Sequence, residues 1–231
     1  MSETASVASV SENAEGVIFD LDGTLYTVRS LGFHIALGLL RETKPLRALF
    51  RVRKEMRGND YGDRRTFKSV FSEILGKYCK MPPDKALDWY ENRFMRRFTE
   101  VLGKRGRVRP GLIPLLEALR SRGIRLGVVS DFGAVPERLD ALGISPSLFD
   151  DVEAAEHFGV MKPTAVPFQR LAERWHLCVE RLVLVGDRAD HDLGSARLLP
   201  APFVGIENKN HFGEGFYPWD TVVRLLGEIG R

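Results

Sequence analysis

The sequence contains little cysteine and no long apolar run, and both absences narrow the class of protein. Its 231 residues include two cysteines, Cys79 and Cys178, which stand far apart and fit neither a disulfide framework nor a metal-binding spacing. Both are expected to be reduced thiols in a cytoplasmic protein. No stretch approaches the roughly 20 apolar residues that cross a bilayer, so we expect no membrane partner.

The amino-terminal residues lack the features of a secretory signal. Residues 1–14 are rich in Ser, Ala, Val and Glu, with neither a basic leader nor a continuous apolar core. We expect a flexible tail there. The chain shows no internal repeat, and its hydrophobic content of 44% with 28% charged residues is that of an ordinary globular protein. The length accommodates one α/β domain with a sizeable insertion.

The most informative stretch is residues 16–24, which read Gly-Val-Ile-Phe-Asp-Leu-Asp-Gly-Thr. Residues 17–19 form an apolar run typical of a strand buried on both faces. Asp20 and Asp22 follow directly, and alternation along an extended segment points both side chains the same way. Parallel strands deliver such residues to the carboxyl edge of the sheet, where ligands bind. Because two neighbouring carboxylates repel each other, a cation or a shared proton is needed to hold them.

Residues 28–107 differ in character from the rest of the chain. Apolar residues recur there at helical spacing, and glycines and prolines interrupt the runs. The spacing predicts an all-helical insertion that lies above the carboxylates as a cap. Residues 25–109 carry 21 Lys and Arg against 9 Asp and Glu, although the formal net charge of the whole chain is only +3. This excess suits an anionic partner, or else the basic side chains simply coat exposed helix faces.

Beyond residue 107, apolar strands alternate with helical segments. Buried strands are predicted at residues 124–129, 149–152, 182–185 and 203–206. This alternation is typical of βαβ units around a parallel sheet. The predicted fold class is therefore α/β, with a parallel sheet between two layers of helices. We place this core at residues 15–27 and 108–231, and the helical cap at residues 28–107.

Polar residues stand where the predicted strands end. Ser130 follows one strand, and Asp187 follows another, with Asp192 five residues later. Lys162 precedes a helix that would begin at the same edge of the sheet. Taken singly, each residue is explained as a turn, a helix cap or a solvated loop. Together with the two carboxylates of the first strand, they predict a site of carboxylates, one hydroxyl and one lysine on one rim.

These residue types suit phosphoryl transfer through a covalent intermediate. An Asp carboxylate can attack phosphorus and form an aspartyl phosphate, while a second carboxylate protonates the leaving oxygen and later activates water. A divalent cation that prefers oxygen ligands, most simply Mg²⁺, would align the phosphate, with Asp187 as a ligand and Asp192 as a ligand or a support. A hydroxyl and an ammonium would stabilise charge on the phosphoryl oxygens.

The chain resembles a known family at these positions. The four ordered motifs of the haloacid dehalogenase superfamily are matched by residues 20–24 (Asp-Leu-Asp-Gly-Thr), Ser130, Lys162 and Gly186-Asp187 with Asp192. The resemblance implies a Rossmann-like core and a cap that opens and closes over the substrate. The insertion after the first motif is similar to the helical cap of the phosphoglycolate-phosphatase-like subgroup.

The resemblance also implies roles for individual residues. Asp20 would be the nucleophile and Asp22 the acid/base. The metal would be held by Asp20, by the main-chain carbonyl of Asp22 and by Asp187. The phosphate would be held by Thr24, Ser130 and Lys162.

Some residues depart from the family pattern or lie outside it. Asp131 stands where phosphatases of this group often carry Asn, and its charge would disfavour a nearby phosphate unless a metal, Lys162 or an arginine offsets it. Tyr26 follows the first motif and is expected to line the pocket. In the cap, Arg64 and Arg65 follow a glycine-containing turn and could contact the anionic substrate.

The sequence therefore predicts a Mg²⁺-dependent phosphatase that hydrolyses a small phosphorylated metabolite. One alternative is a metal-independent haloacid dehalogenase-type hydrolase, which attacks carbon. Another is a non-catalytic protein that binds anions or nucleic acid on the same fold. Nucleic acid is not expected as a partner, because no aromatic-interleaved basic motif or recognition-helix signature is present. Monomer and homodimer both stay open, and the sequence does not name the substrate.

Overall fold

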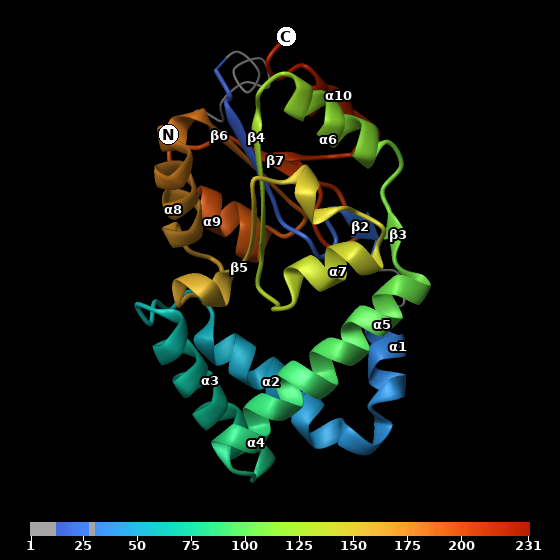
Figure 1. The fold of residues 1–231 in the computed structure, drawn as a ribbon, viewed down its shortest axis with the longest axis vertical. Helices are drawn as coiled ribbons and strands as arrows, with labels where there is room; N and C mark the ends of the chain where they lie inside the picture. Colours follow the sequence, from blue (N-terminus) through green and yellow to red (C-terminus); the bar gives the residue numbers. More distant parts are fainter. Residues whose placement is uncertain (1–12, 28–30) are drawn as a thin grey trace.

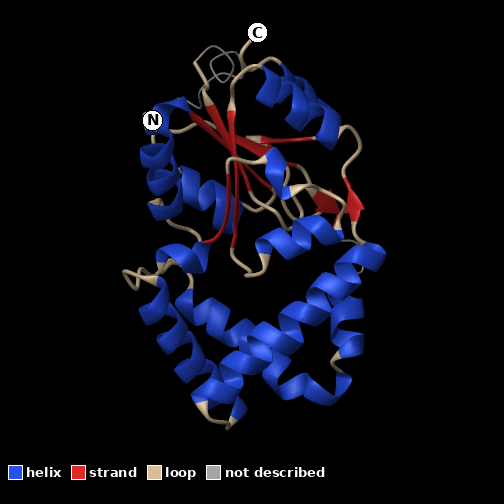
Figure 2. Ribbon diagram, viewed as in Figure 1, coloured by secondary structure: helices blue, strands red, loops and turns tan. Residues whose placement is uncertain are grey.

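A computed structural model describes residues 13–27 and 31–231 of the chain. The molecule has two parts, a twisted sheet with helices and a half made of helices (Figures 1 and 2). Almost all of the predicted tail, and the first residues of the predicted cap, lie outside the described residues. Among the described residues, no helix combines the length and the apolar character needed to cross a bilayer.

The sheet contains six strands in the order β5-β4-β1-β6-β7-β8, and every neighbouring pair is parallel. The strands are β1 (Gly16–Phe19), β4 (Arg125–Ser130), β5 (Asp151–Ala154), β6 (Leu182–Gly186), β7 (Phe203–Ile206) and β8 (Phe216–Tyr217). In the register of the central strand, Phe19 pairs with Val128 of β4 and with Val185 of β6. The three carboxyl ends therefore meet at one edge, as the sequence predicts.

Both faces of the sheet are covered because its strands are apolar on both sides. Val17 and Phe19 belong to a hydrophobic cluster with residues of α6, α7 and α10, whereas Ile18 belongs to a second cluster with α8 and α9 (Figure 1). The covering helices are α6 (Leu112–Ser121), α7 (Val135–Ala141), α8 (Val166–Trp175), α9 (Gly194–Ala196) and α10 (Trp219–Gly227). The predicted α/β class with helices on both faces is confirmed.

The second half of the molecule is built from helices inserted after β1. They are α1 (Leu31–Gly38), α2 (Thr43–Met56), α3 (Arg64–Cys79), α4 (Pro83–Asp88), a π-helical segment (Trp89–Phe94) and α5 (Met95–Arg105). Phe71, Tyr90, Phe94 and Phe98 form a chain of ring contacts inside this half. Phe71, Phe94 and Phe98 are among the apolar residues whose helical spacing predicts the insertion, and their burial explains why it forms helices.

The sequence does not reveal how the chain enters and leaves the helical half. Two short strands, β2 (Tyr26–Thr27) and β3 (Arg107–Val108), pair antiparallel at this point. Arg109 then donates to the main-chain oxygens of Gly23 and Thr24 at 2.7 and 2.8 Å. The two segments that connect the core to the helical half are therefore hydrogen-bonded to each other and to the loop that carries the first motif.

Two predicted element boundaries are wrong by a few residues. The strand expected at residues 149–152 is β5 (Asp151–Ala154), because a 3-10 turn precedes it. The helix predicted at residues 163–175 begins at Val166, so Pro167 lies in its first turn. A proline is tolerated there because the first-turn N–H groups have no partner within the helix.

Candidate active site

The carboxyl edge of the sheet brings the first motif against the fourth, which contains Asp187. Asp20 directly follows β1, Ser130 ends β4, and Asp187 directly follows β6. Gly23 has a φ of +94°, and a Cβ atom on it would lie 2.2 Å from Oδ2 of Asp187. Only glycine fits this position, since both the left-handed backbone and the close approach exclude a side chain.

Lys162 lies at the centre of the site with its side chain only 2% exposed. Its Nζ donates to Oδ1 of Asp20 at 2.6 Å, to Oδ1 of Asp192 at 2.7 Å and to the main-chain oxygen of Val129 at 3.3 Å. These three acceptors match the three protons of an ammonium. Burial lowers the pKa of Lys162, but Asp192 and Asp20 outweigh it and raise that pKa above its ordinary value.

The Asp20 carboxylate is engaged at both oxygens. Lys162 contacts Oδ1, and the hydroxyl of Thr24 donates to Oδ2 at 3.1 Å. Burial and the nearby charges of Asp192, Asp22 and Asp187 raise the pKa of Asp20 well above its ordinary value, although Lys162 acts in the opposite direction. The residue predicted as the nucleophile therefore lies in a cluster of negative charge that one lysine does not fully balance.

Asp20, Asp187 and Asp192 form a group in which one carboxylate oxygen from each residue lies within 4.8 Å of the others. Oδ1 of Asp187 is buried and has no hydrogen-bond partner among the described residues, whereas Oδ2 accepts from Asn208 at 3.2 Å. Burial and the charge of Asp192 raise the pKa of Asp187 to about 7. An all-oxygen donor set with one buried, unpartnered carboxylate oxygen fits a hard divalent cation such as Mg²⁺.

Asp192 contributes less to such a site than Asp187. Its Oδ1 is bound by Lys162, and its Oδ2 accepts from the main-chain N–H of Arg188 at 3.1 Å. Both oxygens therefore position the lysine and the loop after β6. Asn208, which orients Asp187, is missed by the sequence reasoning, because it lies beyond β7 and no local pattern marks it.

Asp22 is held by residues from three other elements, β2, β4 and α7. Arg138 of α7 donates to both carboxylate oxygens, at 2.7 and 2.8 Å, the Tyr26 hydroxyl donates to Oδ1, and Ser130 donates to Oδ2 at 3.0 Å. Burial raises the pKa of Asp22, but Arg138 and the hydroxyl donors outweigh it and hold that pKa below its ordinary value. Tyr26 lies in the site as expected.

Arg138 is a second residue of this site, after Asn208, that sequence reasoning missed. Its side chain is fully buried, between Val135 and Leu139 on the apolar side of α7. The signal was present, because an arginine among the apolar positions of an amphipathic helix must reach a buried acceptor. The spacing alone could not say which acceptor.

The extra charge of Asp131 is compensated by residues from both halves of the molecule. Its Oδ2 lies 2.8 Å from Nδ1 of His191 and 3.7 Å from Nη2 of Arg53, and its Oδ1 accepts from the main-chain N–H of Lys162 at 2.9 Å. Although burial alone would raise it, these contacts hold the pKa of Asp131 well below its ordinary range. Arg53 lies on α2, so the offsetting arginine comes from the helical half.

Asp131→Asn is expected to destabilise the fold by about 1–2 kcal/mol at pH 7, because His191 and Arg53 lose their charged partner. A carboxyl whose folded pKa is depressed stabilises the fold above the unfolded pKa, about 3.9. That contribution is lost as the pH falls toward the lower folded pKa. Urea denaturation from pH 7 to pH 3 measures the difference from wild type, with the exposed Asp140→Asn as the control. If the difference in unfolding free energy between Asp131→Asn and wild type were the same at pH 3 as at pH 7, the assigned role of the Asp131 charge would be contradicted.

Arg64 and Arg65 lie at the start of α3, away from the carboxylate cluster. Nη2 of Arg64 lies 3.5 Å from Oε1 of Glu156, which follows β5 in the core, and Arg65 is exposed. Among the described residues, neither arginine forms an ion pair with the Asp187 group. The sequence prediction that they meet the substrate has no geometric support beyond their position at the contact between the two halves.

The helical half contacts the core beside Lys162. The main-chain N–H of Gly58 donates to Met161 at 3.0 Å, and that of Tyr61 donates to Gly159 at 2.9 Å. Arg57 contacts Asp190 at 2.8 Å. The segment that follows α2 is therefore bound to the loop that carries the buried lysine.

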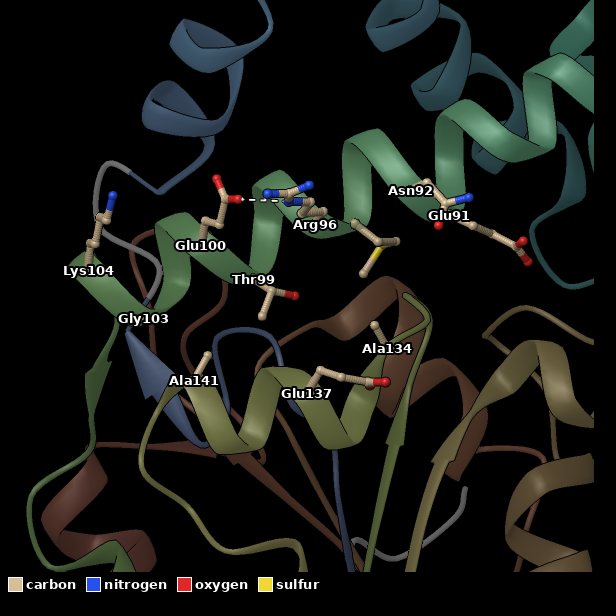
Figure 3. Close-up of a pocket in the computed structure, with 11 residues that line it drawn as sticks. Glu91, Asn92, Arg96, Thr99, Glu100, Gly103, Lys104, Ala134, Glu137 and Ala141 are labelled. Atoms are coloured by element: carbon tan, nitrogen blue, oxygen red, sulfur yellow. Dashed lines mark hydrogen bonds and ion pairs between the residues drawn. The ribbon is translucent and has the colours of Figure 1, made fainter.

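A separate groove of about 720 Å³ lies between α5 and α7. Figure 3 shows Thr99 and Lys104 on one side of it and Ala134, Glu137 and Ala141 on the other. None of the sequence-predicted site residues lines this groove. It is a gap between the helical half and the core, distinct from the carboxylate cluster.

The fold is a Rossmann-like α/β fold, and its charged and polar groups gather at the carboxyl edge of the sheet, where such folds bind ligands. A family model described as haloacid dehalogenase-like hydrolase matches residues 14–199. The chain belongs to this family of hydrolases, so the resemblance seen in the sequence is confirmed.

Relatives with established names extend the comparison. The chain is 32% identical over 200 residues to a glyceraldehyde 3-phosphate phosphatase of Methanocaldococcus jannaschii, covering 80% of this chain and 81% of the relative. It is 30% identical over 198 residues to a phosphoglycolate phosphatase of Rhodospirillum rubrum, covering 82% and 78%. The crystal structure of a HAD phosphatase from Thermococcus onnurineus shares the fold, with a TM-score of 0.60, 21% identity and coverage of 94% and 100%.

Proposed function

We propose that this protein is a Mg²⁺-dependent phosphatase that hydrolyses a small phosphorylated metabolite through an aspartyl phosphate on Asp20. The observation that carries the proposal is the cluster of Asp20, Asp187 and Asp192 around the buried ammonium of Lys162. Such a site offers a nucleophile, cation ligands and a positive charge for phosphoryl oxygens within one small volume.

The proposed reaction has two steps, both carried by residues at the end of β1. An oxygen of Asp20 attacks phosphorus, the ester P–O bond breaks, and Asp22 gives a proton to the leaving oxygen. Water then attacks the phosphorus of the acyl phosphate, the new P–O bond forms as the bond to Asp20 breaks, and Asp22 takes the proton from that water. Release of phosphate restores the Asp20 carboxylate.

The other site residues bind and orient the phosphate. Thr24, Ser130 and Lys162 donate to its oxygens, which requires Thr24 and Lys162 to give up contacts that they make with Asp20. Asp20, the main-chain carbonyl of Asp22 and Asp187 would hold Mg²⁺, with Asp192 in support. When bound, the ion supplies charge neutralisation and alignment of the phosphate with the nucleophile.

The helical half acts as the cap in this proposal, with boundaries at residues 28–107 and a core formed by residues 15–27 and 108–231. The 21 basic against 9 acidic residues of segment 25–109 favour an anionic substrate. The names of the relatives favour phosphate esters of two- and three-carbon acids or aldehydes. Free Cys79 and Cys178 are consistent with the proposed cytoplasmic location.

Hydrolysis is expected to require Mg²⁺ and to stop when EDTA removes it. Purified protein would be assayed for phosphate release on phosphoglycolate, glyceraldehyde 3-phosphate, and panels of sugar and nucleotide phosphates, with and without EDTA. Because the pKa of Asp187 is about 7 without metal, protons compete with the ion for this carboxylate. The apparent Mg²⁺ affinity should therefore decrease when the pH is lowered below about 7. Full activity in EDTA would contradict the proposal, and metal-independent halide release from 2-haloacids would favour the dehalogenase alternative.

A further inference from the structure

The guanidinium of Arg138 joins the end of β1 to the end of β4. Its Nη1 contacts both oxygens of Asp22, and its Nη2 donates to Oγ of Ser130 and to the main-chain oxygen of Phe132, both at 2.7 Å. Nε donates to the main-chain oxygen of Gly133 at 3.1 Å. One buried cation therefore binds the predicted acid/base, the predicted phosphate-binding hydroxyl and the loop between β4 and α7.

The Asp22 carboxylate has no acceptor position left for a substrate in this arrangement. A carboxylate offers about four lone-pair positions, two on each oxygen. Arg138 takes one on each oxygen, Tyr26 takes the second on Oδ1, and Ser130 takes the second on Oδ2. One donor must leave before Asp22 can meet the oxygen of a leaving group.

In the proposed function, Ser130 is the donor that leaves Asp22, because its hydroxyl donates to the phosphate instead. Its hydroxyl has one proton, which points to Asp22 here and would point to a phosphoryl oxygen once the substrate is bound. Arg138 still donates to Oγ of Ser130 and still holds Asp22 from Nη1. The arginine can thus keep both groups in place while the serine proton changes partner.

The burial of Arg138 indicates a role beyond packing. A fully buried guanidinium is costly unless it is paired, and replacing a whole buried ion pair by apolar side chains of similar volume is often neutral or stabilising. Among the described residues, its only ion-pair partner is Asp22. The Cζ atom of Arg138 lies 5.1 Å from the ring centroid of Phe98 on α5, so the helical half contacts this guanidinium.

We propose that Arg138 is a positioning residue that fixes Asp22 for proton transfer and couples it, through Ser130, to binding of the phosphate. This inference rests on the proposed phosphatase function. Because Arg138 also holds the pKa of Asp22 down, its required contribution is geometric. Without Arg138 the Asp22 carboxyl is no longer held in place, so proton donation to the leaving group is harmed more than attack by Asp20. The two steps can be separated by changing the leaving group.

The test compares Arg138→Met and Arg138→Lys with wild type on two Mg²⁺-supported reactions. p-Nitrophenolate leaves without a proton, whereas the alkoxide of an alkyl phosphate such as phosphoglycolate needs one. We expect kcat/KM of Arg138→Met to fall by about 100-fold or more on the alkyl ester, the scale of general-acid catalysis, and by less than about 10-fold on p-nitrophenyl phosphate. Arg138→Lys keeps the buried charge and tests the geometry if the Met variant does not fold.

The matched control is Glu137→Gln, the neighbouring residue on α7, which lines the separate groove (Figure 3). Its ratio of alkyl to aryl activity should equal that of wild type. Added guanidinium ion should partly restore the alkyl activity of Arg138→Ala. Equal losses on both esters, in folded variants, would overturn the role of Arg138. A wild type inactive on both esters would instead refute the proposed function.

Discussion

Asp20→Asn is expected to abolish hydrolysis while the fold persists. The amide cannot form the acyl phosphate, and loss of a nucleophile typically lowers kcat by about 10⁴-fold or more. The raised pKa of Asp20 shows that its charge is disfavoured in the folded state. A carboxyl group whose pKa is higher in the folded than in the unfolded state makes the fold less stable as the pH rises. At pH 7 without metal, the Asn variant should therefore melt at the same temperature as wild type or at a higher one.

This combination separates a catalytic role from a structural one. Phosphate release in the presence of Mg²⁺ gives the activity, and thermal unfolding in EDTA gives the stability. The control is Asp84→Asn, an exposed carboxylate in the first turn of α4, which should match wild type in both measurements. More than about one per cent of wild-type activity in pure Asp20→Asn would contradict the assignment of the nucleophile, given the loss expected for such a residue.

Lys162→Met is expected to damage both stability and activity. The substitution leaves Asp20 and Asp192 buried without their shared cation, and breaking a buried ion pair costs about 3–5 kcal/mol. Activity should fall as well, because the ammonium is the proposed donor to the phosphoryl oxygens. Mg²⁺ should recover part of the lost stability, since it supplies positive charge to the same carboxylates.

Urea denaturation with and without Mg²⁺ measures these effects. The exposed Lys104→Met on α5 is the control, because it removes the same charge from the surface. We expect the stabilisation by Mg²⁺ to be larger in Lys162→Met than in wild type or in the control. A loss of less than about 1 kcal/mol in the metal-free variant, the size of an exposed ion pair, would show that the buried charges are not coupled as the contacts indicate.

Local patterns were enough to predict the sheet and the residues at its carboxyl edge. The apolar run at 17–19 predicts a buried strand from its own composition, and the register of parallel strands then carries Asp20, Ser130 and Asp187 to one rim. Helical spacing likewise predicts the inserted helices. These features depend on neighbours within a few residues, so the chain order alone contains them.

Partners that lie far apart in the sequence could not be predicted in this way. Asp22 and Arg138 are separated by 116 residues, and Arg53 and Asp131 by 78. Which acceptor a buried arginine reaches depends on how α2 and α7 pack, and that packing is set by the whole hydrophobic core. The basic segment at residues 25–109 therefore predicted an anionic partner only in general terms. In the structure, two of its arginines, Arg53 and Arg64, form ion pairs with acidic residues of the core itself.

The amino-acid order thus specifies which chemical groups are present and which strand or helix carries each of them, because secondary structure follows from short-range periodicity. The folded chain decides which of those groups touch. Contact between distant segments arises only when apolar faces are buried together, and the placement of Arg138 against Asp22, of His191 and Arg53 against Asp131, and of Asn208 against Asp187 follows from that burial.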